Sequence, residues 1–129
     1  MIVYAHATSA IAADGAKIYG IDFLGYTNAD VHKACLEVPE RLKMMDTLGI
    51  HAATLYPNVA GFGSQVFLKL EDPDLMLTCV EAYNDFQTDW ASADSRRLLP
   101  IAATPFWDVE ASAREIRRLR SRIGMVFQR

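Results

Sequence analysis

The sequence predicts an α/β fold with parallel strands, on three observations. Helix-like and strand-like patterns alternate from about Glu37 onward. Two apolar runs, at residues 50–56 and 98–104, have the near-continuous apolarity of strands buried on both faces. The 129 residues are 51% hydrophobic and 22% charged, which suits one globular domain with a moderate core.

The first 36 residues are the least regular part of the chain. Two stretches, Ile2–Tyr4 and Lys17–Ile21, resemble strands, and Asp14-Gly15 between them is a hairpin-type turn signal. We expect an irregular lead segment over 1–36 that can form a β-hairpin, followed by the main domain over 37–129.

The first helix is expected to end at Gly49. Pro39 fits its first turn, and the apolar residues of this stretch recur at three-residue spacing: Leu42, Met45 and Leu48. The apolar run at 50–56 then predicts a strand that ends at Pro57.

A second helix and strand follow a glycine-containing loop at 59–71. Asp72 is expected to cap the helix, with Pro73 at its first position. The next apolar residues recur at spacings of three and four, which is typical of an amphipathic helix: Leu75, Met76, Cys79, Val80, Tyr83, Phe86 and Trp90. The run at 98–104 predicts the next strand.

A third helix is expected between Asp108, its cap, and Gly124, its stop. Its arginines lie mostly off the inner face, and we interpret them as a solvated surface that pairs with Glu110 and Glu115. Residues 125–127 begin a third predicted strand. The expected inner face consists of Val109, Ala113, Ile116, Leu119 and Ile123.

This alternation predicts parallel strands joined by right-handed crossovers. A doubly wound sheet and a segment of a (β/α) barrel share the same local signal. The last predicted strand has no covering helix after it, and 1–36 offers no opening βα unit. Because a parallel sheet needs both faces covered, we expect this chain to be part of something larger.

Composition excludes several classes of protein. The chain has 13 basic and 16 acidic residues, and its arginine group lacks interleaved aromatics, which argues against a nucleic-acid partner. No apolar run approaches the roughly 20 residues of a membrane span, and we expect no secretory leader at Met1, because no basic segment and long apolar segment follow it. Cys35 and Cys79 stand outside any metal or redox motif, so we expect reduced thiols in a cytoplasmic protein.

The three histidines, His6, His32 and His51, are the first candidates for metal ligands. A zinc site needs several donors at about 2.0–2.2 Å, and each histidine stands alone. His6 lacks the second histidine of an HxH pair, and His32 lies in a polar, solvated stretch. His51 begins its strand, at the end of a barrel away from the chemistry. The sequence therefore predicts no metal site of its own.

Carboxylates and glycines are equally unspecific. Asp72, Asp74 and Asp108 are explained by helix capping and by the helix dipole. Ser64, beside Gly63, matches neither a nucleophile elbow nor a phosphate-binding loop. We predict no catalytic residue in this chain.

The ends of the two central strands are the candidate pocket. Ligands of parallel α/β proteins bind beyond the carboxyl ends of the strands. Phe106 and Trp107 fit packing beneath a loop equally well. The candidate substrate-pocket residues are Tyr56, Asn58, Thr104, Phe106 and Trp107.

Short motifs over about two-thirds of the chain carry a family resemblance. Met-Asp-x-x-Gly-Ile at 45–50 and Ala-Tyr-Asn-Asp at 82–85 are the most specific when taken together. In this order the motifs resemble amidohydrolase family 2, which includes decarboxylases of the aminocarboxymuconate-semialdehyde and resorcylate types. The matching pieces are Arg41–Ile50, Leu55–Asn58, Cys79–Phe86, Arg97–Ala102, Asp108, Ala113–Arg118, and Gly124 before Val126-Phe127.

The resemblance implies a partial (β/α)8 TIM barrel, with about three parallel βα units in this chain. It implies a metal-dependent hydrolase or non-oxidative decarboxylase that acts on a small, aromatic or carboxylate-bearing substrate. The full-length parent would hold one divalent metal, often zinc, through an HxH pair, a further histidine and a late aspartate. No position here corresponds to those ligands, so this chain alone is expected to be inactive.

Within this family interpretation, Tyr83 packs on the buried face of its helix and Asn84 satisfies a neighbouring backbone group. A different class is also open, because an incomplete barrel exposes strand edges that invite pairing. The alternative is a non-catalytic chain that binds a partner or forms a homo-oligomer. A small complete flavodoxin-like domain is a third interpretation.

Overall fold

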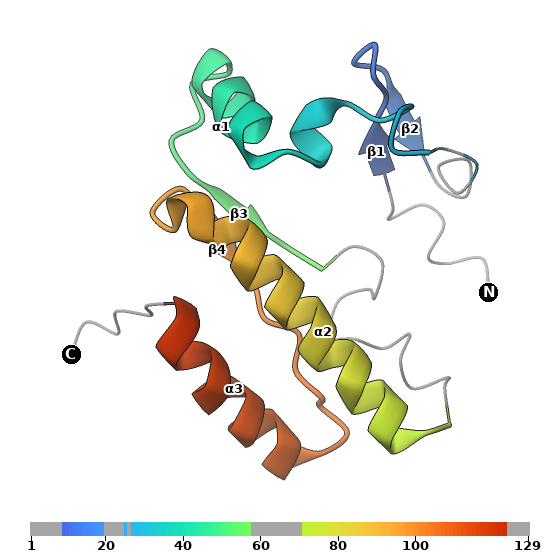
Figure 1. Ribbon diagram of the computed structural model, residues 1–129, viewed down its shortest axis with the longest axis vertical. Helices are drawn as coiled ribbons and strands as arrows, with labels where there is room; N and C mark the ends of the chain where they lie inside the picture. The colour runs from blue at the N-terminus through green and yellow to red at the C-terminus, as the bar shows by residue number, and fades with distance from the viewer. Residues whose placement is uncertain (1–8, 20–24, 26, 58–70, 124–129) are drawn as a thin grey trace. The chain divides into compact units, whose positions relative to one another are not determined.

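The computed structural model describes residues 9–19, 25, 27–57 and 71–123. It is a mixed helix-and-strand structure with a short parallel sheet, as the α/β prediction requires. The chain divides into two compact units, Met1–Ala52 and Ala53–Arg129, which we describe in turn (Figure 1).

The first unit begins with a β-hairpin. Strand β1 (Ser9–Ile11) pairs antiparallel with β2 (Lys17–Tyr19). The turn between them uses Gly15 at φ +89°, a backbone conformation that favours glycine, and the Asp14 carboxylate accepts a hydrogen bond from the Ala16 N–H at 2.9 Å. The hairpin therefore forms where Asp14-Gly15 predicts it, with a different first strand. The expected strand at Ile2–Tyr4 lies outside the described residues.

The same unit contains a short 3-10 helix, η2 (Lys33–Cys35), and helix α1 (Val38–Thr47). His32 caps η2, since its Nδ1 accepts a hydrogen bond from the Ala34 N–H at 3.1 Å, so this histidine is half-buried and bonded instead of simply solvated. Helix α1 has the predicted proline in its first turn, and Gly49 follows it at φ +69°. Met45 is its buried apolar residue.

The second unit is built on two short parallel strands. β3 (Ala53–Leu55) pairs with β4 (Leu98–Pro100), and Leu55 lies level with Pro100. The pairing continues for one bond, from the Ile101 N–H to the Leu55 carbonyl at 2.9 Å. The predicted parallel pairing is confirmed, although both strands are shorter than the apolar runs at 50–56 and 98–104.

These strands are buried on one face, and the expectation that both faces are buried is wrong for the described residues. Leu98 is fully buried, whereas Leu99 of β4 is exposed, as are Ile101 after β4 and Tyr56 after β3. Successive side chains of a strand point to opposite faces, and α2 packs against β4. Leu99 lies on the face opposite Leu98 and is exposed.

Helix α2 (Pro73–Ala91) begins as predicted, because the Asp72 carboxylate accepts hydrogen bonds from the N–H groups of Asp74 and Leu75. Its buried face agrees with the predicted one in part, since Met76 and Val80 are buried as predicted. Leu75 and Phe86 are exposed, while the predicted Cys79, Tyr83 and Trp90 are half-buried. The buried face consists of Met76, Val80, Asn84, Thr88 and Ala91.

A one-turn 3-10 helix, η4 (Ser92–Asp94), leads to β4, and helix α3 (Val109–Ile123) follows. Asp108 caps α3 as predicted, through its carboxylate and the Ala111 N–H at 2.9 Å. The predicted inner face is wrong in part. Val109 and Ile116 are exposed, whereas Leu119 is buried as predicted and Ala113 is half-buried. Ala111 and Glu115, which were not predicted to lie inside, are buried. The Ile123 side chain and the strand expected at 125–127 lie outside the described part.

The two long helices lie parallel and side by side in this unit (Figure 1). Asn84 bonds Glu115, and Asp89, five residues later, bonds Arg122, so both helices run in the same direction. At about 100° per residue, the exposed apolar residues of each helix fall on the side away from the other helix. The buried residues of α2 therefore face β4 and α3, while large apolar side chains stay exposed on both helices.

The structure also bears on the expectations for the cysteines and for membrane spans. Cys35 and Cys79 are both free thiols, with Cys79 half-buried on α2. Within the described residues, none of the helices combines the length and apolarity of a membrane span.

Candidate functional site

Asn84 ties helix α2 to the segment that follows β4. Its Nδ2 donates to the Ala103 carbonyl at 2.8 Å, and its Oδ1 accepts from the Ala103 N–H at 2.8 Å. Asn84 and Ala103 are both buried. The Asn84 amide therefore makes the hydrogen bonds that the Ala103 backbone, which lies beyond the end of β4, would otherwise make to water. The predicted role of Asn84 is confirmed. Ala103 directly precedes the candidate pocket residue Thr104.

Glu115 completes this arrangement from helix α3. Its Oε1 accepts a hydrogen bond from Asn84 Nδ2 at 2.7 Å, and Arg118 Nε donates to its Oε2 at 2.7 Å. Glu115 is only 2% exposed, contrary to the expected surface position. Burial raises the pKa of this carboxyl, but the hydrogen bonds from Arg118 and Asn84 outweigh burial and leave the pKa below its ordinary value. Glu115 is therefore a buried carboxylate ion.

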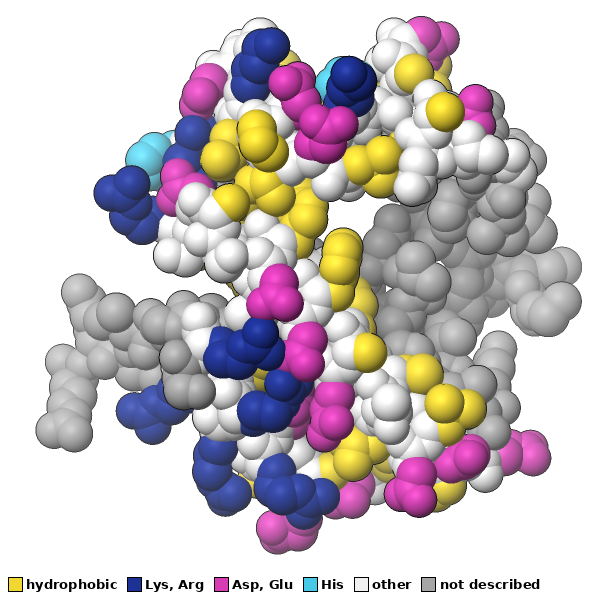
Figure 2. Space-filling model, in the orientation of Figure 1, with side chains coloured by type: hydrophobic (Ala, Val, Ile, Leu, Met, Phe, Trp, Pro, Cys, Tyr) yellow, Lys and Arg dark blue, Asp and Glu magenta, His cyan; other side chains and the backbone are white. Residues whose placement is uncertain are grey.

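Arginines extend this contact to the acidic side chains of α2. Arg118 Nη1 donates to Asp85 Oδ1 at 2.6 Å, Arg122 bonds the same oxygen, and Arg122 Nη2 donates to Asp89 Oδ1 at 2.7 Å. The hydrogen bond from Arg118 lowers the pKa of Asp85, and both acidic partners raise the pKa of Arg118. Figure 2 shows arginine and acidic side chains lying side by side over these helices. We call Asn84, Asp85, Asp89, Glu115, Arg118 and Arg122 the interhelical network.

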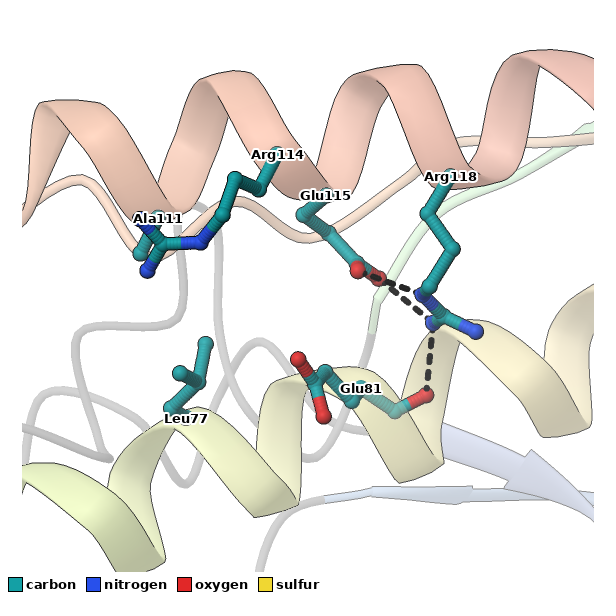
Figure 3. Close-up of a pocket in the computed structure, with 6 residues that line it drawn as sticks. All are labelled: Leu77, Glu81, Ala111, Arg114, Glu115 and Arg118. Atoms are coloured by element: carbon teal, nitrogen blue, oxygen red, sulfur yellow. Dashed lines mark hydrogen bonds and ion pairs between the residues drawn. The ribbon is translucent and has the colours of Figure 1, made fainter.

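A cavity of about 300 Å³ lies beside this network, between α2 and α3 (Figure 3). Its charges balance, two glutamates against two arginines, and Arg118 is already committed to Glu115. A balanced lining favours neither a cation nor an anion, so we interpret this cavity as a cleft of the helix layer. The lining residues are Leu77, Glu81, Ala111, Arg114, Glu115 and Arg118.

The candidate pocket residues follow the carboxyl ends of β3 and β4. The strand register places Leu55 level with Pro100, so Tyr56 lies one residue beyond that level and Thr104 lies four residues beyond it. Tyr56 and Phe106 are exposed, whereas Thr104 and Trp107 are half-buried. Asn58 lies outside the described residues.

Phe106 and Trp107 stand on a turn that is held at both ends. Ala103 is held by Asn84, and the Pro105 carbonyl accepts hydrogen bonds from the Asp108 N–H at 2.8 Å and from the Ser112 hydroxyl at 2.9 Å. The two rings meet edge to face, with centroids 5.4 Å apart. This arrangement can present an aromatic wall to a planar molecule, and it supplies no acid or base.

The described donors do not fit a metal site. Among the residues that the structure describes, no three histidine, cysteine or carboxylate side chains come together as a metal would require. The best-placed carboxylates are already used: Asp72 and Asp108 cap helices, while Asp85 and Glu115 bind arginines. His6 lies outside the described residues.

Comparison of the chain with protein-family models and with curated proteins gives no match. The resemblance to amidohydrolase family 2 therefore stays a prediction that rests on the motifs themselves.

The sequence missed the buried ion of the interhelical network. The spacing of Glu115 and Arg118 predicts an ion pair on the helix surface, and that pair exists. The i,i+3 spacing says nothing of Asn84 and Asp85, which approach from another helix and draw the pair inward. The available signal was the position of Glu115 on helix α3. It lies four residues from both Ala111 and Leu119, so the three side chains share one face, and the other two are buried.

Proposed function

We propose that this chain is a section of a metal-dependent amidohydrolase-type (β/α)-barrel enzyme. The reaction of the parent would be hydrolysis or non-oxidative decarboxylation of a small, aromatic or carboxylate-bearing molecule. The observation that carries the proposal is the parallel pairing of β3 with β4. It directs both strand ends, with Tyr56 after one and Thr104 to Trp107 after the other, toward the same edge of the sheet, where barrel enzymes bind substrate.

The distribution of apolar residues supports a section of a barrel over a complete small domain. Barrel strands bury one face against helices and the other in the barrel interior, and each helix packs between two neighbours. Here Leu99 and Ile101 form an uncovered apolar strand face, while Phe86 and Ile116 lie on uncovered helix flanks. A complete flavodoxin-like domain would bury its sheet on both faces.

The chain's own residues would bind and orient the substrate. Phe106 and Trp107 would form an aromatic wall, and Asn84 would hold the segment behind that wall through Ala103. A divalent metal, zinc in the first instance, would polarise a substrate oxygen or activate water in the parent. Because the described donors do not fit it, the metal would be held by residues other than these.

The DNA on both sides of the coding segment tests this proposal. We expect an in-frame His-x-His upstream and further βα units downstream. The opposite result would be a frame closed on both sides, together with stoichiometric zinc on this chain alone and turnover that is lost on chelation.

The pocket assignment has a separate test in the enzyme expressed from the extended frame. Trp107→Ala should lower kcat/KM by about tenfold or more, because an aromatic contact with the substrate is lost. The matched control is Trp90→Ala on helix α2, which removes the same ring away from the strand ends. Equal losses in the two variants would contradict the assignment.

A further inference from the structure

The interhelical network meets the turn that carries Phe106 and Trp107 at one side chain, Asn84. Both hydrogens of the Asn84 amide are used, because Nδ2 donates to the Ala103 carbonyl at 2.8 Å and to Glu115 Oε1 at 2.7 Å. Its Oδ1 accepts a hydrogen bond from the Ala103 N–H at 2.8 Å. Asn84, Ala103 and Glu115 are each 2% exposed, so these bonds lie inside the protein. Asn84 therefore joins a carboxylate of helix α3 to the backbone that leads to the two rings.

The charge of Glu115 determines which end of the Asn84 amide faces helix α3. Arg118 holds Glu115 through two hydrogen bonds, and an ionised carboxylate only accepts hydrogen bonds, so the NH2 group of Asn84 must lie on its side. In the flipped amide, Oδ1 would face the carboxylate and the NH2 group would face the Ala103 N–H. Buried acceptors or donors that face each other lose their hydrogen bonds. The ion therefore favours the one amide orientation that pairs with Ala103.

The turn at 104–107 is held at its two ends by different contacts. Beyond the turn, the Asp108 N–H and the Ser112 hydroxyl of α3 donate to the Pro105 carbonyl. Before the turn, Ala103 is held by Asn84 of α2. The first of these contacts does not pass through the network, so a change that starts at Glu115 reaches the turn by way of Ala103.

We propose that Glu115 is a positioning residue of the candidate pocket, which acts on the aromatic wall of Phe106 and Trp107 through Asn84 and Ala103. A change in the helix pair then alters the pocket although no pocket residue is replaced. The role of the wall in substrate binding rests on the proposed function, whereas the link between Glu115 and the wall is a property of this chain alone.

The fluorescence of Trp107 tests this link without substrate or metal. The chain has two tryptophans, so Trp90→Phe leaves Trp107 as the single emitter. In this background, Glu115→Gln replaces one carboxylate oxygen by an NH2 group. Arg118 takes the remaining oxygen, and the NH2 group then favours the flipped Asn84 amide. Acrylamide quenching of Trp107 should rise and its emission should shift to longer wavelength, because the start of the turn loosens and the half-buried indole gains contact with water.

A double variant shows whether the effect passes through Asn84. Asn84→Ala alone should change the quenching of Trp107 in the same direction. Glu115→Gln should add nothing once Asn84 is alanine, since the link is already broken. If Glu115→Gln is unfolded by circular dichroism, Glu115→Asp takes its place, because the shorter side chain keeps the charge and withdraws it from Asn84.

Asp85→Asn is the matched control for a general loosening of the helix pair. It also removes an ion pair with Arg118, yet the Asp85 side chain binds arginines and not Ala103, so the fluorescence of Trp107 should stay unchanged. The proposal is overturned if a folded Glu115 variant leaves Trp107 unchanged, if Asp85→Asn changes it equally, or if the double variant adds the two single effects. A failure of the proposed function would appear separately, as a closed reading frame around the coding segment.

Discussion

At the residue scale, the interhelical network is the feature whose stability depends most on satisfied charges and hydrogen bonds. A carboxylate as buried as that of Glu115 is stable only when its charge and its lone pairs are both satisfied. Arg118 supplies two hydrogen bonds and Asn84 supplies a third, so the ion costs less than its burial alone suggests. Because Asn84 also binds Ala103, the same side chains locate the segment that carries Phe106 and Trp107.

Glu115→Gln should lower the free energy of unfolding by about 2 kcal/mol. The estimate lies below the roughly 3–5 kcal/mol of a fully buried pair because the Arg118 side chain is 34% exposed and keeps Asp85. The amide group cannot accept both hydrogen bonds from Arg118. Urea unfolding at neutral pH measures the change, with Glu110→Gln at an exposed position of the same helix as the control.

We expect the stability of Glu115→Gln and of its control Glu110→Gln to depend differently on pH. The pKa of Glu115 is lowered in the folded state, so its stabilising contribution is complete above the ordinary value of 4.5 and disappears as the pH falls through the lower folded value. Glu115→Gln should therefore lose less stability on acidification than the wild type or Glu110→Gln. Identical pH profiles for all three chains would show that Glu115 is not the ionised group described above.

Asn84→Ala should cost about 2–4 kcal/mol, because the N–H and the carbonyl of Ala103 both lose their partner in a buried place. The exposed Thr78→Ala on the same helix should change stability by less than about 0.5 kcal/mol. Thermal unfolding followed by circular dichroism compares the two. A small effect at Asn84 would mean that water replaces the amide at Ala103.

At the element scale, the helix boundaries follow local chemistry, whereas the buried faces do not. Asp72 and Asp108 cap their helices as short-range capping rules predict. On α3, however, the apolar residues at spacings of three and four predict burial of Val109 and Ile116, and both are exposed. The apolar residues of a helix reflect its contacts with every neighbouring element. Their spacing therefore does not show which of them face the sheet and which lie on another side of the helix.

This correction predicts a contrast on helix α3. Leu119→Ala should cost about 2–5 kcal/mol, because a fully buried leucine is truncated, whereas Ile116→Ala should cost less than about 1 kcal/mol. Chemical unfolding at low protein concentration measures both without a contribution from self-association. Equal losses of unfolding free energy in the two variants would support the inner face that the sequence predicts.

At the scale of the whole molecule, the second unit leaves large apolar side chains exposed on its strand face and on both long helices. They include Leu99, Phe86 and Ile116. Such surfaces are satisfied by further βα units in a parent enzyme or by other copies of the chain.

We expect the isolated chain to bind no stoichiometric zinc. Asp72 and Asp108 are held by helix N-termini, and Asp85 and Glu115 are held by arginines, so a metal would have to displace these partners. Isothermal titration with zinc, together with thermal unfolding with and without a chelator, measures this. Tight one-to-one binding would contradict the interpretation of the donor set.

The order of the elements could be predicted from the sequence because it depends on short-range chemistry. Capping residues, glycines at positive φ and apolar periodicity act within a few positions, and they determined α1, α2, α3 and the parallel alternation around β3 and β4. The need of Asn84 for a backbone partner was likewise predictable, since a polar side chain within an apolar stripe must be satisfied.

Only the tertiary structure decided which faces are buried and that Glu115 is an ion inside the protein. Its partner Asn84 lies 31 positions away in the chain, and Asp85, which shares Arg118 with it, lies 33 positions from that arginine. Local patterns carry no information about such distances. The energy of a buried charge depends on the groups that surround it in space, and those groups come together only when the two helices pack.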